Sequence, residues 1–123
     1  MLHADWLARR ADAHPDRPAI LDVDRGRTTT YRGLSEGGWR AAAVLRSTFG
    51  VRPGDRVAVH ARNRVEQVEV FFACARLGAL MVPLNWRLAA PELAGIVQDA
   101  KPSLILADAE GLEQLAGLPS SSV

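Results

Sequence analysis

Three short, almost entirely apolar runs, separated by segments with helical periodicity, limit what this chain can fold into more than any other feature. The runs cover residues 56–61, 79–84 and 103–107. Strands that are apolar on both faces are typical of parallel sheets, which are covered by helices on both sides, whereas half-exposed strands alternate. The order strand, helix, strand, helix, strand therefore predicts an α/β fold with three layers, a parallel sheet between helices.

The segments between these runs carry the start and stop signals of helices. One helix is expected to open with capping-box spacing at Asn63 and to end at Gly78. A second is expected to open at Pro91, because proline is favoured in the first helical turn, and to run to about Ala100. A short last helix is expected around residues 112–115.

The N-terminal third predicts a smaller unit in front of the sheet. A short amphipathic helix is expected over residues 4–12, then a small β-hairpin around the turn 24–27, then a long helix over 31–49 with Thr30 as its N-cap. Three glycines fall within that long helix: Gly33, Gly37 and Gly38. Each costs about 1 kcal/mol against alanine, so they indicate either a frayed first half or close packing of one face.

Charge and hydropathy exclude several classes of protein. The 15 Lys+Arg and 14 Asp+Glu give a net charge of +1 and are spread along the chain, so nucleic acid is not an expected partner. No apolar run approaches the ~20 residues of a membrane span, and the first residues lack the layout of a signal peptide. We expect a cytoplasmic protein in which the single cysteine, Cys74, is a buried thiol.

The strongest candidate for catalysis is Ser35. The residues around it, Gly33-Leu34-Ser35-Glu36-Gly37, match the nucleophile-elbow pattern G-x-S-x-G between a strand and a helix. A serine hydrolase also needs a histidine later in the chain, and the one that follows, His60, is expected within an apolar strand. An ordinary serine on a helix surface is therefore the preferred interpretation, and a serine hydrolase is a third hypothesis for function.

Other residues with useful chemistry are scattered. The histidines lack the spacing of a metal site: His3, His14 and His60. Threonines 28–30 have no flanking glycines and serines 120–122 form a terminal tail, so neither run makes a phosphate-binding loop. Lys101, the only lysine, stands at an expected helix end, where a cation favours the helix dipole. We expect no catalytic, cofactor-binding or metal-binding residue in this chain.

Four segments, in this order and at this spacing, carry a family resemblance: residues 14–20, 30–34, 51–59 and 77–88. The most specific part is the run Val82-Pro83-Leu84-Asn85-Trp86-Arg87-Leu88. Together the segments resemble the opening of the AMP-forming acyl-CoA synthetase superfamily, the acyl-adenylate-forming ligases. The resemblance implies that residues 1–118 form a partial N-terminal subdomain and that 119–123 are a disordered tail or a truncation point.

In this family the complete enzyme binds ATP and Mg, joins AMP to a carboxylic acid and passes the acyl group to coenzyme A. The family's phosphate loop, magnesium-binding glutamate, ribose-binding aspartate and C-terminal lysine match no position here, so no such role is transferred. The resemblance thus implies an N-terminal fragment of an acid–CoA ligase that is inactive alone. ATP, Mg and CoA are implied for the complete enzyme, and the residues that select the acid would lie beyond Val123.

An alternative is a stand-alone remnant that acts as a binding or dimerisation module, because a parallel sheet cut short leaves an open edge. The expected partner is either the remainder of the ligase chain or a second copy paired through that edge. One position departs from the family locally. Ala89 stands where threonine is common, and loss of that hydroxyl cap should cost about 1 kcal/mol of helix stability.

Overall fold

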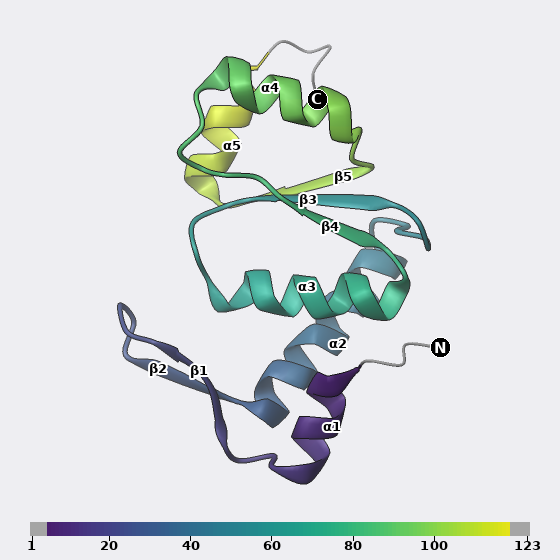
Figure 1. Ribbon diagram of the computed structural model, residues 1–123, viewed down its shortest axis with the longest axis vertical. Coiled ribbons are helices and arrows are strands. Elements are labelled where there is room, and N and C mark those ends of the chain that lie inside the picture. The colour runs from purple at the N-terminus through teal and green to yellow at the C-terminus, as the bar shows by residue number, and fades with distance from the viewer. Residues whose placement is uncertain (1–4, 119–123) are drawn as a thin grey trace.

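The computed structural model describes residues 5–118 as a three-layer α/β unit with a smaller helical and hairpin unit attached (Figure 1). The chain order alternates helices and strands after the hairpin, as the apolar runs predict. The elements are α1 (Trp6–Ala13), β1 (Pro18–Asp22), β2 (Arg27–Thr30), α2 (Tyr31–Ser47), β3 (Arg56–His60), α3 (Val65–Leu77), β4 (Leu80–Pro83), α4 (Ala90–Ala100), β5 (Leu104–Ala107) and α5 (Ala109–Ala116).

The three apolar strands form a parallel sheet in the spatial order β4-β3-β5. Helix α3 covers one face, and α4 with α5 cover the other (Figure 1). Alternate residues of β3 accordingly enter different cores: Val57 packs on the α3 side, and Ala58 on the α4 and α5 side. The predicted fold class, a parallel sheet between helices with a small antiparallel hairpin, is confirmed.

Strand β3 is buried because it has a neighbour on each side and a helical layer on each face. Val57 and Ala58 have no exposed surface, and Val59 and His60 are also buried. Strands β4 and β5 each pair only with β3 among residues 5–118. Each of these strands therefore has one edge whose backbone groups have no strand partner in this part of the chain.

Strands β1 and β2, with helices α1 and α2, form the smaller unit, which lies beyond α3 (Figure 1). Leu7, Leu34 and Phe72 make its buried core, so α3 contributes to this core as well as to the sheet. Thr30 caps α2 as predicted: its hydroxyl accepts a hydrogen bond from the Gly33 N–H at 3.1 Å. Helix α3 is consequently the layer shared by both units.

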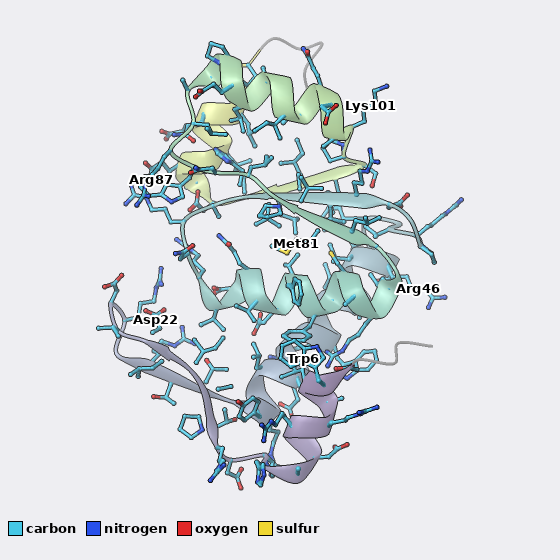
Figure 2. The ribbon with its side chains drawn as sticks, in the orientation of Figure 1. Trp6, Asp22, Arg46, Met81, Arg87 and Lys101 are labelled. Atoms are coloured by element: carbon cyan, nitrogen blue, oxygen red, sulfur yellow. The ribbon has the colours of Figure 1, made fainter. Side chains whose placement is uncertain are left out.

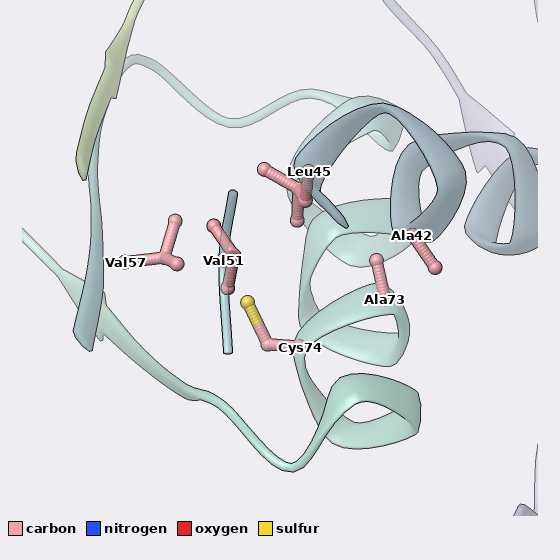
Figure 3. Close-up of a cluster of buried hydrophobic side chains, with 6 residues drawn as sticks. All are labelled: Ala42, Leu45, Val51, Val57, Ala73 and Cys74. Atoms are coloured by element: carbon pink, nitrogen blue, oxygen red, sulfur yellow. The ribbon is translucent and has the colours of Figure 1, made fainter. Parts of the chain in front are cut away.

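Helices α2 and α3 pack closely, which decides the meaning of the glycines in α2. Gly37 and Gly38 are both buried. A Cβ at Gly37 would collide with the Glu69 carboxylate, and one at Gly38 would lie 2.7 Å from the Arg76 guanidinium. The glycines reflect close helix packing and not fraying. Figure 3 shows the apolar cluster that continues from this contact toward the sheet: Ala42, Leu45, Val51, Val57, Ala73 and Cys74.

Two expectations about helix ends were wrong. The N-cap of α3 is Arg64, without a side-chain cap, and not Asn63. The Gln67 side chain instead ties α3 to the preceding loop by donating to the carbonyls of Ala61 at 2.9 Å and Arg62 at 2.7 Å. Helix α5 is also longer than expected, because Asp108 caps it from the end of β5.

Helix α4 has half of a capping box. Glu92 accepts a hydrogen bond from the Ala89 N–H at 3.0 Å, and the alanine side chain has no atom that could return one. The missing hydroxyl expected at Ala89 is thus a real gap in the cap. No helix within residues 5–118 is both long and apolar enough to cross a membrane. The tail proposed at 119–123 lies outside the described residues.

Two helical glycines offer a matched test of how closely α5 packs against the backbone of β3. Gly111 in α5 is buried, and a Cβ there would collide with the His60 carbonyl, a backbone atom of the central strand, whereas Gly95 in α4 has open space. We expect Gly111→Ala to lower the free energy of unfolding by about 1–3 kcal/mol through overpacking. Gly95→Ala should raise it by up to about 1 kcal/mol through helix propensity. Urea denaturation of both variants measures this, and equal effects would contradict it.

Glu69 should make the fold sensitive to pH. Burial, with the nearby Glu66 charge, raises the pKa of Glu69. The folded state therefore favours the protonated carboxyl, and stability is lost as pH rises through the raised folded pKa. We expect Glu69→Gln, compared with the wild type, to raise Tm more at pH 7 than at pH 4. The exposed Glu36→Gln is the control, and a Tm gain for Glu69→Gln that does not change with pH would contradict the assignment.

Candidate functional site

The carboxyl ends of the three parallel strands lie at one edge of the sheet, the left edge in Figure 1. In α/β folds this edge is where ligands bind, because the loops that leave the strands meet there. Residues 61–64 follow β3, residues 84–89 follow β4, and Asp108 follows β5. We define these segments together as the carboxyl edge.

Trp86 lies at the centre of the carboxyl edge between two arginines. The guanidinium carbon of Arg62 is 4.7 Å from the Trp86 ring centroid, and that of Arg87 is 4.9 Å from it. These distances are within the range of cation–π attraction. Arg87 is exposed, and Figure 2 shows it at this edge of the molecule. The edge thus presents two cations on one aromatic ring.

Asp108 and Glu110 hold the loop after β3 in place. The Asp108 carboxylate accepts hydrogen bonds from the Gly111 N–H at 2.8 Å and from the Arg62 N–H at 3.1 Å. These two backbone bonds hold the pKa of Asp108 below its usual value. The Arg62 guanidinium pairs with Glu110 at 3.0 Å, with both side chains about half exposed. Arg62 is therefore positioned by α5 from one side and by Trp86 from the other.

A cavity of about 220 Å³ lies beside this edge, between the ends of β3 and β5 and the first turn of α3. Its walls include Val59, Leu106 and Val70, with Arg64 and Gln67 at the polar side. The start of α3 has no side-chain cap, so the partial positive charge of its first N–H groups adds to that of Arg64. Two carboxylates also line the cavity, those of Glu66 and Asp108, so its apolar walls carry charges of both signs.

No group of three or more His, Cys, Asp or Glu side chains that could hold a metal occurs within residues 5–118. The sequence interpretation missed Trp86 as a possible ligand contact, although it lies in the most specific family segment. An aromatic residue next to an arginine, three residues after an apolar strand, was the available signal.

Ser35 is not placed as a nucleophile. It lies within α2 and not on a strand-to-helix turn, and it is buried. Its hydroxyl accepts a hydrogen bond from the Arg76 guanidinium at 3.1 Å, while His60 pairs with Gln114 at 2.6 Å. The serine hydrolase hypothesis is therefore wrong in its geometry. The preferred alternative, an exposed surface serine, is also corrected, because Ser35 belongs to a buried polar network.

Arg76 organises that network and is only 2% exposed. It donates to Asp5 at 2.7 Å and to the Ser35 carbonyl at 2.9 Å, and its guanidinium carbon lies 4.3 Å from the Trp39 ring centroid. Burial opposes ionisation of Asp5, yet the hydrogen bonds from Arg76 and the Ala8 N–H outweigh it, so the pKa of Asp5 is lowered. The network fastens α1 to α2 and α3, which is a structural role.

The remaining candidates lie apart from the carboxyl edge. Lys101 ends α4 in a left-handed conformation, with φ 47°, and Figure 2 shows it on the other side of the molecule from Arg87. His14 is exposed at the end of α1. Burial raises the pKa of the Cys74 thiol, as expected for an unreactive core cysteine. His3 and serines 120–122 lie outside the described residues.

The fold defines the class, an α/β unit with a parallel sheet between helices and a small antiparallel hairpin. The chain belongs to the AMP-binding enzyme family, whose model matches residues 7–122. The resemblance to the N-terminal segment of the acyl-adenylate-forming ligases is thereby confirmed.

Characterised relatives are several times longer. Feruloyl-CoA synthase of Amycolatopsis sp is 41% identical over 113 residues, which cover 92% of this chain and 22% of the relative. The fatty acid–acyl-carrier-protein ligase ScoC of Streptomyces coeruleorubidus is 40% identical over 100 residues, which cover 81% of this chain and 19% of the relative. This chain thus spans about a fifth of the length of both.

Solved structures agree with the family assignment. The N-terminal domain of FACL13 from Mycobacterium tuberculosis superimposes with a TM-score of 0.87 at 32% identity, over 95% of this chain and 30% of that one. The anthranilate CoA ligase AuaEII gives a TM-score of 0.83 at 28% identity, over 91% of this chain and 21% of that one. The described fold is therefore that of the first part of such an N-terminal domain.

Proposed function

We propose that this chain is the opening segment of an acid–CoA ligase and supplies part of the ligand-binding wall of its N-terminal domain. The observation that carries the proposal is the intact family scaffold with an arginine and tryptophan platform at its carboxyl edge. Relatives that share the scaffold are named as CoA synthases and ligases. The parent reaction would join a carboxylic acid to CoA through an acyl-adenylate, with ATP and Mg.

We propose that the chain is catalytically silent alone. The side chains that could transfer protons or bind phosphate are dispersed in the described residues: Ser35 pairs with Arg76, His60 is buried under α5, and Lys101 ends α4. None of them forms a grouping with a nucleophile and a base. The outer sides of β4 and β5, which have no strand partner in the described residues, would be covered by the remainder of the ligase chain. That remainder is the partner we propose.

Titration with Mg-ATP tests the proposal that this chain is catalytically silent. Since no glycine-rich phosphate loop is present in the sequence, we expect calorimetric titration of this chain with Mg-ATP to show no saturable binding below millimolar concentration. A full-length acid–CoA ligase, titrated under the same conditions, is the positive control. Tight saturable binding to the 123-residue chain would contradict the proposal.

We further propose that the carboxyl edge contacts the anionic part of CoA. Arg87 is exposed, and its cation–π contact with Trp86 leaves its N–H groups free to meet a phosphate. Trp86 is partly buried, and the guanidinium groups of Arg62 and Arg87 both lie on its ring. Guanidinium groups on an aromatic ring suit a nucleotide phosphate better than a neutral ligand.

The three tryptophans make this contact measurable. We expect the Trp86 indole resonance in proton–nitrogen NMR spectra to shift when CoA is added at millimolar concentration, because Trp86 lies at the carboxyl edge, whereas those of Trp6 and Trp39 stay in place. Pantetheine, which lacks the phosphates, should have a weaker effect. Arg87→Gln should reduce the response to CoA by several-fold, since one charge-assisted contact is worth about 1.5–3 kcal/mol before solvent screening.

Arg46 provides the matched control for that measurement. It is an exposed arginine near the end of α2, and Figure 2 shows it on the opposite side of the molecule from Arg87. Arg46→Gln removes the same charge from the chain and should leave the CoA response of Trp86 unchanged. Equal losses in both variants would show a non-specific charge effect and would contradict the site.

A further inference from the structure

His60 is a fully buried imidazole with one unpaired ring nitrogen. The side chain has no exposed surface. Its Nε2 lies 2.6 Å from the Gln114 side-chain oxygen, so Nε2 carries the proton and donates it. Nδ1 is buried and has no hydrogen-bond partner within residues 5–118. The site suits the neutral ring better than the cation, because a second proton on Nδ1 would add a buried charge that finds no acceptor there.

The orientation of the His60 ring prevents the nearest carboxylate, that of Asp108, from accepting a hydrogen bond from a protonated Nδ1. A Cβ placed on Gly111 would lie 3.1 Å from the His60 Cδ2 and 3.1 Å from the Asp108 Oδ1, so the Cδ2 edge of the ring faces the start of α5. Nδ1 is on the opposite edge of the imidazole from Cδ2. Asp108 therefore lies on the wrong side of the ring to accept a proton from Nδ1.

The other residues around the His60 ring would do little to stabilise a positive charge on it. His60 is on the same sheet face as Ala58, whose cluster includes apolar residues from α4 and from the segment after β4: Leu84, Leu93 and Val97. The charged groups near this junction are Asp108 and Glu110 of the α5 segment and Arg62 and Arg64 of the loop after β3. Asp108 attracts a charge on His60, but its carboxylate is already held by two backbone N–H groups, while Glu110 pairs with Arg62 and the arginines repel an imidazolium.

Helix α5 depends on few contacts. Its Gln114 pairs with His60, its Leu115 enters the core, and its Glu110 pairs with Arg62 across a half-exposed ion pair. Exposed ion pairs of this kind contribute little, at about 0–1 kcal/mol. Docking of α5 and the turn after it on the sheet therefore relies on Leu115 and Leu118 in the core, on the Asp108 cap and on the His60 contact.

We propose that His60 is a pH-sensitive contact that holds α5 on the sheet while neutral and releases α5 when protonated. One proton from solvent binds Nδ1 and converts the imidazole to an imidazolium. A buried charge without an acceptor is strongly unfavourable, whereas with α5 undocked the same cation is hydrated. The undocked state thus binds the additional proton, and docking weakens as pH falls.

Release of α5 would alter the carboxyl edge directly. Asp108 and Glu110, which position Arg62 through a backbone bond and an ion pair, belong to the α5 segment. Undocking removes both restraints and leaves Arg62 held by its contact with Trp86. The consequence for ligand binding rests on the proposed function, whereas the release of α5 does not.

Amide hydrogen exchange of the full chain tests the release. A proton that is excluded from the docked state and bound in the undocked state should lower α5 protection about tenfold between pH 7.5 and pH 5.5, after correction for intrinsic exchange. Protection of α3 should change much less. His60→Gln keeps an amide donor for Gln114 and does not titrate, so its α5 protection should stay constant. The exposed His14→Gln should behave as the wild type does.

A second measurement holds whether or not the His60→Gln variant folds. Nitrogen NMR of the wild-type imidazole should show a proton on Nε2 and a bare Nδ1 at pH 7.5, with protonation of Nδ1 accompanying loss of α5 protection. Protonation while α5 stays protected, or loss of protection to the same extent in wild type and His60→Gln, would overturn the proposal. CoA binding at the carboxyl edge is measured separately at pH 7.5, so failure of one result leaves the other interpretable.

Discussion

Burial of β3 on both faces is the constraint on which the rest of the structure depends. Val57 belongs to the core under α3 and Ala58 to the core under α4 and α5, so one strand joins both apolar clusters. Such a strand has to be short, apolar and paired on both sides, since its backbone groups cannot reach water. The same strand ends at His60 and delivers Arg62 to the carboxyl edge, so core packing also sets the geometry of the candidate site.

Contact between α2 and α3 joins the smaller unit to this sheet by a different kind of interaction. Gly37 and Gly38 allow the helices to approach, and Arg76 fills the space with a desolvated guanidinium bound to Asp5 and Ser35. A buried ion pair adds little net stability, but removal of one partner leaves an unpaired charge in the interior. The pair therefore acts mainly to specify how α1 sits on α2 and α3.

The elements of the fold were predictable from the sequence because their signals are local. Apolar runs, Gly78 and Pro91 mark strands and helix ends within a few residues of the chain. One error is local, because Gln67 and not Asn63 ties down the start of α3. Another arose where a tertiary contact overrides a local pattern, because Arg76 donates a hydrogen bond to the hydroxyl of Ser35. Similarly, the carboxyl edge joins residues 62, 86 and 108, whose proximity follows from strand order and not from any motif.

The charges at the carboxyl edge explain why a segment of this kind would bind a ligand weakly by itself. Glu110 already pairs with Arg62, so part of the positive field at the edge is neutralised within the chain. Arg87 keeps its charge available, but on an exposed loop where water screens it. A guanidinium gains strength when neighbouring surfaces exclude water. The edge would therefore reach full affinity for an anion only when the rest of a ligase domain covers Trp86 and Arg87, and binding and chemistry would be assembled together.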